Sequence, residues 1–191
     1  EYTSYTYTAV IRNNAGGEGT PSNSYTIKLD VVPPTATSNI YSYTDDVAPQ
    51  TGEFLSGSKT NDTSPTLNIS VAGTLATGDV VAVYRDGVKI GNASLSGGVY
   101  RYTDNSALQD GQTYKYTTCI EDAAGNQGTL SSGFILTIDL VPPPKPTDPI
   151  TLYDDNVGEK TGILAINIPT DDTTPGFVVG KLNDGESAYL Y

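Results

Sequence analysis

The chain has 191 residues, of which 22 are Asp or Glu and 10 are Lys or Arg, so its net charge is −12 and its isoelectric point is about 4.1. This balance argues against nucleic acid or an anionic lipid surface as a partner, since both are bound by clustered Lys and Arg, and no apolar run is long enough for membrane insertion. The chain has no histidine, which excludes a Ser-His or Cys-His catalytic pair, and its single cysteine, Cys119, excludes an intrachain disulfide.

In chain order, apolar and polar residues alternate over short segments, which is the period of a half-buried β-strand. The predicted strands lie within residues 25–31, 66–71, 80–91, 99–103, 113–121 and 134–140. The Asp86-Gly87 pair inside the third of these segments predicts a tight hairpin turn. No segment has a convincing helical period. Short strands with turn signals at this density predict an all-β fold built as a two-sheet sandwich.

The first long segment of the chain recurs 109 residues later. Residues 4–34 align with residues 113–143 without a gap and share 13 of 31 positions. A second match pairs Asp45-Asp46 with Asp154-Asp155, and TNDTSP with TDDTTP, which begin at Thr60 and Thr170. A third pairs two segments, GTLATGDVVAVY and GKLNDGESAYLY, that end at Tyr84 and Tyr191. Self-similarity at a fixed long period is typical of an array of domains.

Prolines follow two of the predicted strands and define the domain boundaries. Residues 31–34 read VVPP, and residues 141–144 read VPPP. Proline fixes φ and cannot donate to a sheet, so these segments end the strands and act as short, semi-rigid connectors. The predicted units are therefore the C-terminal part of one domain at 1–33, a complete domain at 34–143, and the N-terminal part of a third at 144–191.

Two side chains on the segment 108–121 have structural interpretations. An Asp-Gly turn precedes a tyrosine-rich strand in LQDGQTYKY, and we expect Tyr114 to bond back to the preceding chain through its hydroxyl group, as in a tyrosine corner. Strand alternation places Cys119 on the face opposite Tyr116 and Ile120. We expect Cys119 to be a filler of the β-surface rather than a reactive thiol.

Acidic residues on predicted loops are the candidate metal ligands. Ca²⁺ takes six to eight oxygen ligands, and carboxylates packed at a joint repel one another without a cation. The candidate ligands are Asp30, Asp45, Asp46, Asp122, Asn126, Asp139, Asp154 and Asp155, with Asp62, Asp171 and Asp172 as weaker candidates. We expect Asp30 to meet Asp122 and Asn126 at one connector, and Asp45 and Asp46 to meet Asp139 at the next. The alternative is that these residues only bond their own backbone in Asx-turns.

The succession IDLVPP, DDNVG, TDDTTP, GTLATGDVVAVYRDGVKIG and LQDGQTYKYTTCIEDAAGNQG resembles bacterial immunoglobulin-like repeats. These repeats belong to giant, non-fimbrial surface adhesins exported by type I secretion, of the biofilm-associated and Salmonella giant-adhesin kind. The resemblance implies tandem immunoglobulin-like β-sandwich domains with Greek-key topology, a location on the bacterial cell surface, and Ca²⁺ at or near the domain junctions. The first unit departs from the pattern at residues 12–17, where RNNAGG stands in place of EDAAGN.

Two functions follow as hypotheses, and neither is enzymatic. In the first, the chain is a calcium-stiffened spacer of a secreted adhesin, in which neighbouring repeats are its immediate partners and the whole adhesin contacts a host-cell or biofilm surface. In the second, the sandwich itself binds a glycan or protein through exposed tyrosines such as Tyr41, Tyr43 and Tyr102. We also expect the two half-domains, which would expose unpaired strand edges, to be completed by a longer chain or by neighbouring molecules.

Overall fold

The computed structural model describes residues 2–144, 152–159, 161–165, 167–180, 182 and 187–189. All regular elements in this part of the chain are β-strands, which confirms the all-β prediction. In chain order they are β1 (Thr3–Tyr7), β2 (Tyr25–Leu29), β3 (Thr37–Asp45), β4 (Gly52–Phe54), β5 (Lys59–Thr60), β6 (Thr66–Ala72), β7 (Val80–Arg85), β8 (Val88–Ser96), β9 (Val99–Thr103), β10 (Thr113–Glu121), β11 (Phe134–Ile138), β12 (Leu152–Asp155), β13 (Gly162–Ala165) and β14 (Gly176–Phe177). The chain divides into two compact units, Glu1–Leu140 and Val141–Tyr191.

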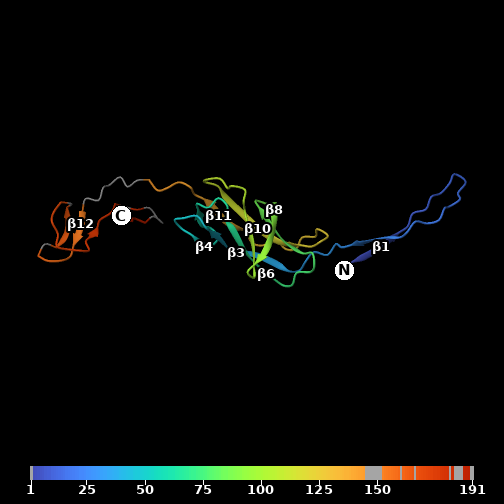
Figure 1. The fold of residues 1–191 in the computed structure, drawn as a ribbon, viewed down its shortest axis with the longest axis horizontal. Coiled ribbons are helices and arrows are strands. Elements are labelled where there is room, and N and C mark those ends of the chain that lie inside the picture. Colours follow the sequence, from blue (N-terminus) through green and yellow to red (C-terminus); the bar gives the residue numbers. More distant parts are fainter. Residues whose placement is uncertain are drawn as a thin grey trace. The chain divides into compact units, whose positions relative to one another are not determined.

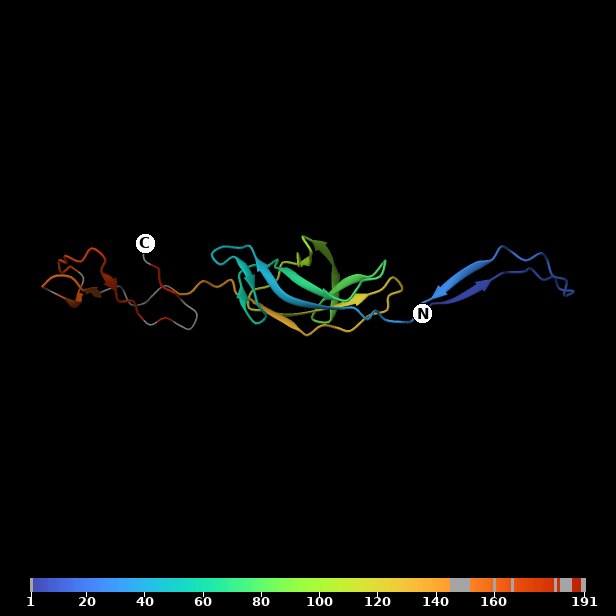
Figure 2. The ribbon, with the colours of Figure 1, turned by 90° about the horizontal axis from the view of Figure 1, so that it is seen from below.

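Strands β3 to β11 form a two-layered sandwich (Figures 1 and 2). Hydrogen bonding runs in the order β4-β3-β6-β9-β8-β7-β10-β11-β5. Strand β8 belongs to both layers, because Val88 to Ala93 pair with β7 whereas Ser94 to Ser96 pair with β9. The two ends of the order are the short strands β4 and β5, and short edge strands offer little template for unwanted pairing.

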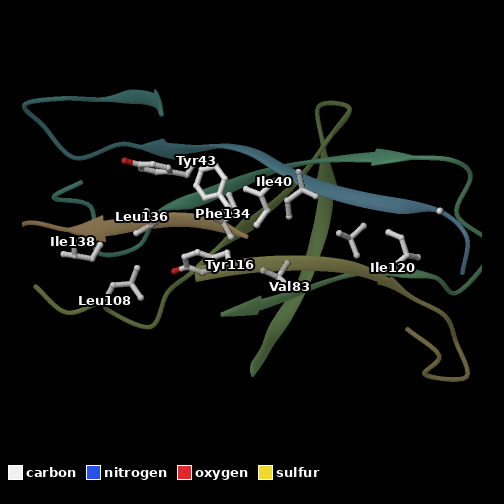
Figure 3. Close-up of a cluster of buried hydrophobic side chains, with 13 residues drawn as sticks. Ile40, Tyr43, Val83, Leu108, Tyr116, Ile120, Phe134, Leu136 and Ile138 are labelled. Carbon is white, nitrogen blue, oxygen red and sulfur yellow. The ribbon is translucent and has the colours of Figure 1, made fainter. Parts of the chain in front are cut away.

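The core lies between the two layers and is built from every second residue of the facing strands (Figure 3). Along β11, for example, Phe134, Leu136 and Ile138 are buried while the residues between them face outward. The ring of Tyr43 on β3 stands edge-on to Phe134, with 6.2 Å between ring centroids, and stacks against Phe54 at 5.7 Å. Such aromatic pairs contribute about 0.5–1.5 kcal/mol each beyond the area they bury. The Tyr43–Phe134 pair fastens the β3 layer to the β11 layer, whereas Tyr43–Phe54 joins two neighbouring strands of one layer.

The predicted hairpin between β7 and β8 is confirmed. Asp86 and Gly87 at its tip have φ angles of 50° and 82°. Positive φ at both central residues is typical of a type I′ turn, whose twist matches that of the flanking strands, and Asp-Gly is one of the sequences that tolerate it best.

Strands β1 and β2 form an antiparallel hairpin that repeats the hairpin of β10 and β11. Tyr5 faces Ile27 in the first, and Tyr114 faces Leu136 in the second. Each residue of the first pair precedes its counterpart by 109 positions, so the register is the same in both copies. The difference is burial: β1 and β2 are exposed along their whole length, because among the described strands they pair only with each other.

The C-terminal unit contains a three-stranded sheet in the order β13-β12-β14. Tyr153 on β12 takes the place of Tyr43 and is also buried. Both partners of β12 are antiparallel to it, as β4 and β6 are to β3. Much of the third sequence match, which ends at Tyr191, lies outside the described residues.

The surface position expected for Cys119 is wrong. Alternation does place its side chain away from the main core, beside Ala82 and Tyr84, but the thiol is completely buried. The cover comes from Tyr84, whose hydroxyl group accepts a hydrogen bond of 2.8 Å from Gln127 Nε2 on the loop after β10. Burial raises the pKa of the Cys119 thiol, which lowers its nucleophilicity at neutral pH.

Candidate functional site

The loop after β10 holds two of the predicted ligands in a closed turn. The carboxylate of Asp122 accepts hydrogen bonds from the backbone N–H groups of Ala124 (2.9 Å) and Asn126 (2.8 Å) and from the side-chain amide of Asn126 (2.9 Å). The pKa of Asp122 is lowered, chiefly by the Asn126 side chain. The charged carboxylate is therefore the form that fits this loop.

The same loop reaches the first connector. Asn126 Nδ2 also donates to the backbone carbonyl oxygen of Asp30 at 3.1 Å. The carboxylate of Asp30 accepts from the N–H group of Val32 at 3.1 Å, in an Asx-turn that leads toward the prolines. The structure thus brings together Asp30, Asp122 and Asn126, as predicted, although Asp30 contributes its carbonyl oxygen to the contact rather than its carboxylate.

The second group of candidates forms a buried network around Thr60. Asp45 is almost fully buried, and its carboxylate accepts from the Val47 N–H group at 2.9 Å and from the Thr60 hydroxyl at 2.5 Å. The Thr60 hydroxyl accepts in turn from the N–H group of Asp62 (3.0 Å), and the carboxylate of Asp62 accepts from Ser64 (2.7 Å). Asp45 and Asp62 each accept a hydrogen bond from the N–H group two residues further on, which is the Asx-turn arrangement.

Charge accumulates at this network. Burial raises the pKa of Asp62, and the nearby carboxylates of Asp45 and Asp46 raise it further. Asp139 is also close, because its N–H group donates to the carbonyl oxygen of Thr60 at 2.9 Å. Its carboxylate pairs with Lys59 Nζ at 2.8 Å. Asp45 and Asp139 are therefore both hydrogen-bonded to one residue, Thr60, and the grouping of Asp45 and Asp46 with Asp139 around a cation stays a prediction.

The same network recurs in the C-terminal unit. Asp155 accepts from the N–H group of Val157 (3.2 Å) and the Thr170 hydroxyl (2.7 Å), and the N–H group of Asp172 donates to Thr170 at 2.9 Å. A further hydrogen bond from Thr174 to Asp172 (2.8 Å) lowers the pKa of Asp172.

This recurrence corrects the pairing of the aspartates. The two networks are related by 110 residues, so Asp45 corresponds to Asp155 and Asp46 to Asn156. The pairing of Asp45-Asp46 with Asp154-Asp155 in the sequence is one residue out of register. Asp154 corresponds to Thr44 and is exposed, as is Asp171.

The chemistry of these groups suits calcium, whereas their arrangement is that of hydrogen-bonded turns. Carboxylate, amide and carbonyl oxygens are ligands that Ca²⁺ prefers. Across the described residues, however, no three or more His, Cys, Asp or Glu side chains are arranged to hold a metal ion. An ion at either place would draw the rest of its six to eight ligands from backbone carbonyl groups or water.

One buried polar cluster has no counterpart among the predicted sites. Asp104, at 2% exposure, accepts hydrogen bonds from the Tyr116 hydroxyl (2.8 Å) and Arg85 Nη1 (2.6 Å). Its other oxygen accepts from the backbone and hydroxyl groups of Ser106, which also contacts Arg85. The signal in the sequence is the pattern Asp-x-Ser/Thr, which Asp104 shares with Asp62 and Asp172. The cluster joins β7 to β10 and closes one end of the core.

The tyrosine corner is confirmed. The hydroxyl group of Tyr114 accepts a hydrogen bond of 3.0 Å from the N–H group of Gln109, and Arg85 lies over its ring at 5.6 Å. The proposed sugar-stacking role of Tyr43 is wrong, because its ring is fully buried between the two layers. Tyr102 is half-buried and donates its hydroxyl proton to the carbonyl oxygen of Ile90. Of the three tyrosines named, Tyr41 alone is exposed.

In the part of the chain that the structure describes, no helix is long and apolar enough to cross a membrane. No curated protein matches the chain. Residues 37–140, more than half of the chain, match the family model described as bacterial Ig-like domain. This segment is the nine-stranded sandwich, from the start of β3 to just beyond β11. Domains of this family are typically non-enzymatic and usually occur in extracellular or surface proteins. The chain therefore belongs to the bacterial Ig-like domain family.

Proposed function

We propose that this chain is a spacer segment from the stalk of a large, type I-secreted bacterial adhesin, rigidified by Ca²⁺ near its connectors. In this role the domains hold an adhesive tip away from the cell and bind neither substrate nor receptor themselves. The alternative, direct glycan binding through the sandwich face, has lost its main support, because Tyr43 is buried and Tyr102 is bonded within its own sheet.

The observation that carries the proposal is the repetition of detail between the two hairpins. Ser22 N–H donates to the carbonyl oxygen of Ala9 at 2.8 Å, and Ser131 N–H donates to that of Thr118 at 2.7 Å. Both serine hydroxyl groups also accept from the partner residue's N–H group at 2.9 Å. Two successive units that share even these contacts belong to one type of domain, and an array of one domain type suits a stalk.

The connector after the first hairpin supports stiffness. It contains Pro33 and Pro34, and Asn126 of the following domain is hydrogen-bonded to Asp30 at its start. A connector that is short, rich in proline and bonded to the next domain has few conformations available. A spacer benefits from this property, whereas a freely jointed chain would let the tip collapse onto the cell.

Calcium would act on the carboxylates that gather near the connectors. Asp45, Asp46 and Asp62 interact unfavourably with one another when charged. A bound cation would relieve this repulsion and would stabilise the folded state by mass action, by about 2.7 kcal/mol at one hundred times its Kd.

The test is thermal unfolding and small-angle scattering of the 191-residue chain in calcium and then in EDTA. We expect calcium to raise the melting temperature by about 10 °C, as mass action predicts for a domain of this size, and to increase the maximum dimension of the particle. Mg²⁺ at the same concentration is the control for ionic strength. The substitutions D45N and D122N should each reduce the calcium response, since each removes a charged ligand from one group.

Identical melting curves and scattering profiles in calcium and EDTA would rule out the calcium part of the proposal. A glycan array probed with the chain tests the spacer part separately. A spacer binds no glycan on the array, whereas specific binding that is lost in Y41A would support the alternative function.

A further inference from the structure

The chain enters the nine-stranded sandwich at one end and leaves it at the opposite end (Figure 2). The entry lies beside the end of β10, because a Cβ atom added at Gly128 would contact the carbonyl oxygens of both Pro34 and Ile120. The exit lies beside the start of β10, where Thr113 faces Thr137 of β11. Tension on the chain therefore pulls β3 toward one end of the sandwich and β11 toward the other.

The first and last strands of the sandwich, β3 and β11, do not pair with each other. Strand β3 pairs with β4 and β6, and β11 pairs with β10 and β5. Residues 56–60, which end in β5, are hydrogen-bonded to both β3 and β11. We call residues 56–60 the clamp segment.

On one side, the clamp segment follows β11 along its edge. The hydrogen bonds run from Ile135 N–H to the Ser56 hydroxyl (2.9 Å), from Gly57 N–H to the Ile135 carbonyl oxygen (2.7 Å), from Thr137 N–H to the Ser58 carbonyl oxygen (3.2 Å) and from Asp139 N–H to the Thr60 carbonyl oxygen (2.9 Å). The two strands of this contact, β5 and β11, are parallel. The clamp segment thus holds the whole of β11, up to the residue that follows it.

On the other side, the clamp segment is bonded to two buried side chains of β3. The hydroxyl group of Tyr43 donates to the carbonyl oxygen of Lys59 at 3.4 Å and accepts from the hydroxyl of Ser58 at 3.2 Å. The Thr60 hydroxyl donates to the carboxylate of Asp45 at 2.5 Å. Tyr43 and Asp45 are at most 3% exposed, so water does not compete for these bonds.

Tension loads all of these bonds at the same time. When β3 and β11 are pulled in opposite directions, each has to slide along the clamp segment. Hydrogen bonds between strands run across the strand direction, and therefore across the direction of the pull. They have to break together, whereas bonds at a peeling edge break one after another.

We propose that the sandwich is a load-bearing module and that the clamp segment sets the force at which it unfolds. The proposal takes the source of the tension from the spacer role proposed above, because a stalk is stretched when its tip is held and the cell is pulled away. The mechanical property itself needs neither calcium nor a bound ligand.

The proposal separates mechanical strength from overall stability. In the transition state of forced unfolding the clamp bonds are broken and the rest of the core is intact. Loss of a clamp bond therefore speeds unfolding, whereas loss of a bond that is still present in that state does not. Tyr43 and Tyr116 allow a matched comparison, because both rings are fully buried. The hydroxyl of Tyr116 donates to Asp104, outside the clamp segment.

The experiment stretches the 191-residue chain between handles at its two ends, at constant force and in EDTA. Unfolding of the sandwich is identified by the release of roughly 300 Å of chain. Y43F should unfold about tenfold faster than the wild type at the same force, because it loses two hydrogen bonds of ordinary strength. Y116F should unfold under force at the wild-type rate. Urea unfolding without force should show both variants destabilised to a similar extent.

A second pair of variants avoids any change in the core. Ser56 and Ser131 each accept a backbone N–H group at 2.9 Å, from Ile135 and Thr118 respectively. S56A removes a clamp bond and should speed forced unfolding about fivefold. S131A removes a bond on the loop that precedes β11, which is loaded only after β11 is released, and should have no effect on the rate.

Two results would overturn the proposal. One is an unchanged rate of forced unfolding in both Y43F and S56A. The other is equal acceleration in the control variants Y116F and S131A, which would show that resistance to force simply follows overall stability. Because the stretching is done in EDTA and without ligand, a failure here is distinct from a failure of the calcium or glycan tests of the proposed function.

Discussion

The buried carboxylate of Asp104 shows how a single side chain can organise one end of a β-sandwich. It accepts hydrogen bonds from a tyrosine, an arginine and a serine, which come from three different segments. Burial alone would raise the pKa of Asp104, but hydrogen bonds from Ser106, Tyr116 and Arg85 outweigh burial and lower it. Burial by itself would lower the pKa of Arg85. The hydrogen bond and the charge of Asp104 outweigh burial and hold the Arg85 pKa above its usual value. The pair is therefore charged in the folded protein.

We predict that D104N destabilises the domain by about 3 kcal/mol at pH 7, because it leaves Arg85 partly buried without its counter-charge. The folded pKa of Asp104 lies below its unfolded value, so its contribution is complete above the unfolded pKa of about 4 and is lost as pH falls through the folded pKa. Urea unfolding at pH 7 and at pH 3 measures both effects. The difference between wild type and D104N should shrink at the lower pH. D79N is the control, because Asp79 lies at a half-buried turn where the Asn carbonyl oxygen can accept the same hydrogen bond from the Ala76 N–H group, and it should change stability by less than about 1 kcal/mol. An equally small effect of D104N would contradict the assignment.

Between elements, the loop after β10 crosses closely over the segment that leads into β3. A Cβ atom added at Gly128 would lie 2.8 Å from the carbonyl oxygen of Pro34 and 3.3 Å from that of Ile120. Both obstacles are backbone atoms, which cannot move aside as a flexible side chain can. Glycine at this position is what allows the connector to pass along the loop and Asn126 to reach Asp30.

G128A should therefore destabilise the domain by about 1–3 kcal/mol, the range typical of overpacking at a rigid site. G133A is the matched control, because its added Cβ meets only the mobile side chain of Lys115. Chemical denaturation of both variants makes the comparison. If G133A were as destabilising as G128A, loss of glycine in the loop, and not the crossing with the connector, would be the cause.

At the scale of the whole molecule, two hairpins of the same sequence pattern have very different surroundings. β10 and β11 pack against a complete second layer, whereas β1 and β2 are exposed from end to end. An isolated two-stranded hairpin is only marginally stable in water, since its backbone hydrogen bonds have no buried core to support them. The stability of the chain is therefore concentrated in residues 37–140.

Hydrogen exchange should reveal this contrast directly. In the 191-residue chain, amides of β10 and β11 should exchange only with global unfolding, and amides of β1 and β2 should exchange nearly as fast as in an unfolded chain. Mass spectrometry of peptides from the two hairpins provides the measurement, and each hairpin is the internal control for the other. Comparable protection of the two hairpins would contradict this prediction and would show that β1 and β2 are as stable as β10 and β11.

The sequence by itself determined the all-β fold, the Asp86-Gly87 turn, the tyrosine corner of Tyr114 and the equivalence of the two hairpins. These features depend on short-range patterns: alternation of apolar residues, positive φ at a turn, and a repeat that can be counted. It also indicated that Asp30, Asp122 and Asn126 lie together. Tertiary structure alone decided which tyrosines are exposed, that Cys119 is covered by Tyr84, that Asp45 corresponds to Asp155, and that Asp104 joins Arg85 to Tyr116. The physical reason is that alternation defines the two faces of a strand but not what packs on them. A side chain on either face is buried or exposed according to the strands and loops that arrive from elsewhere in the chain.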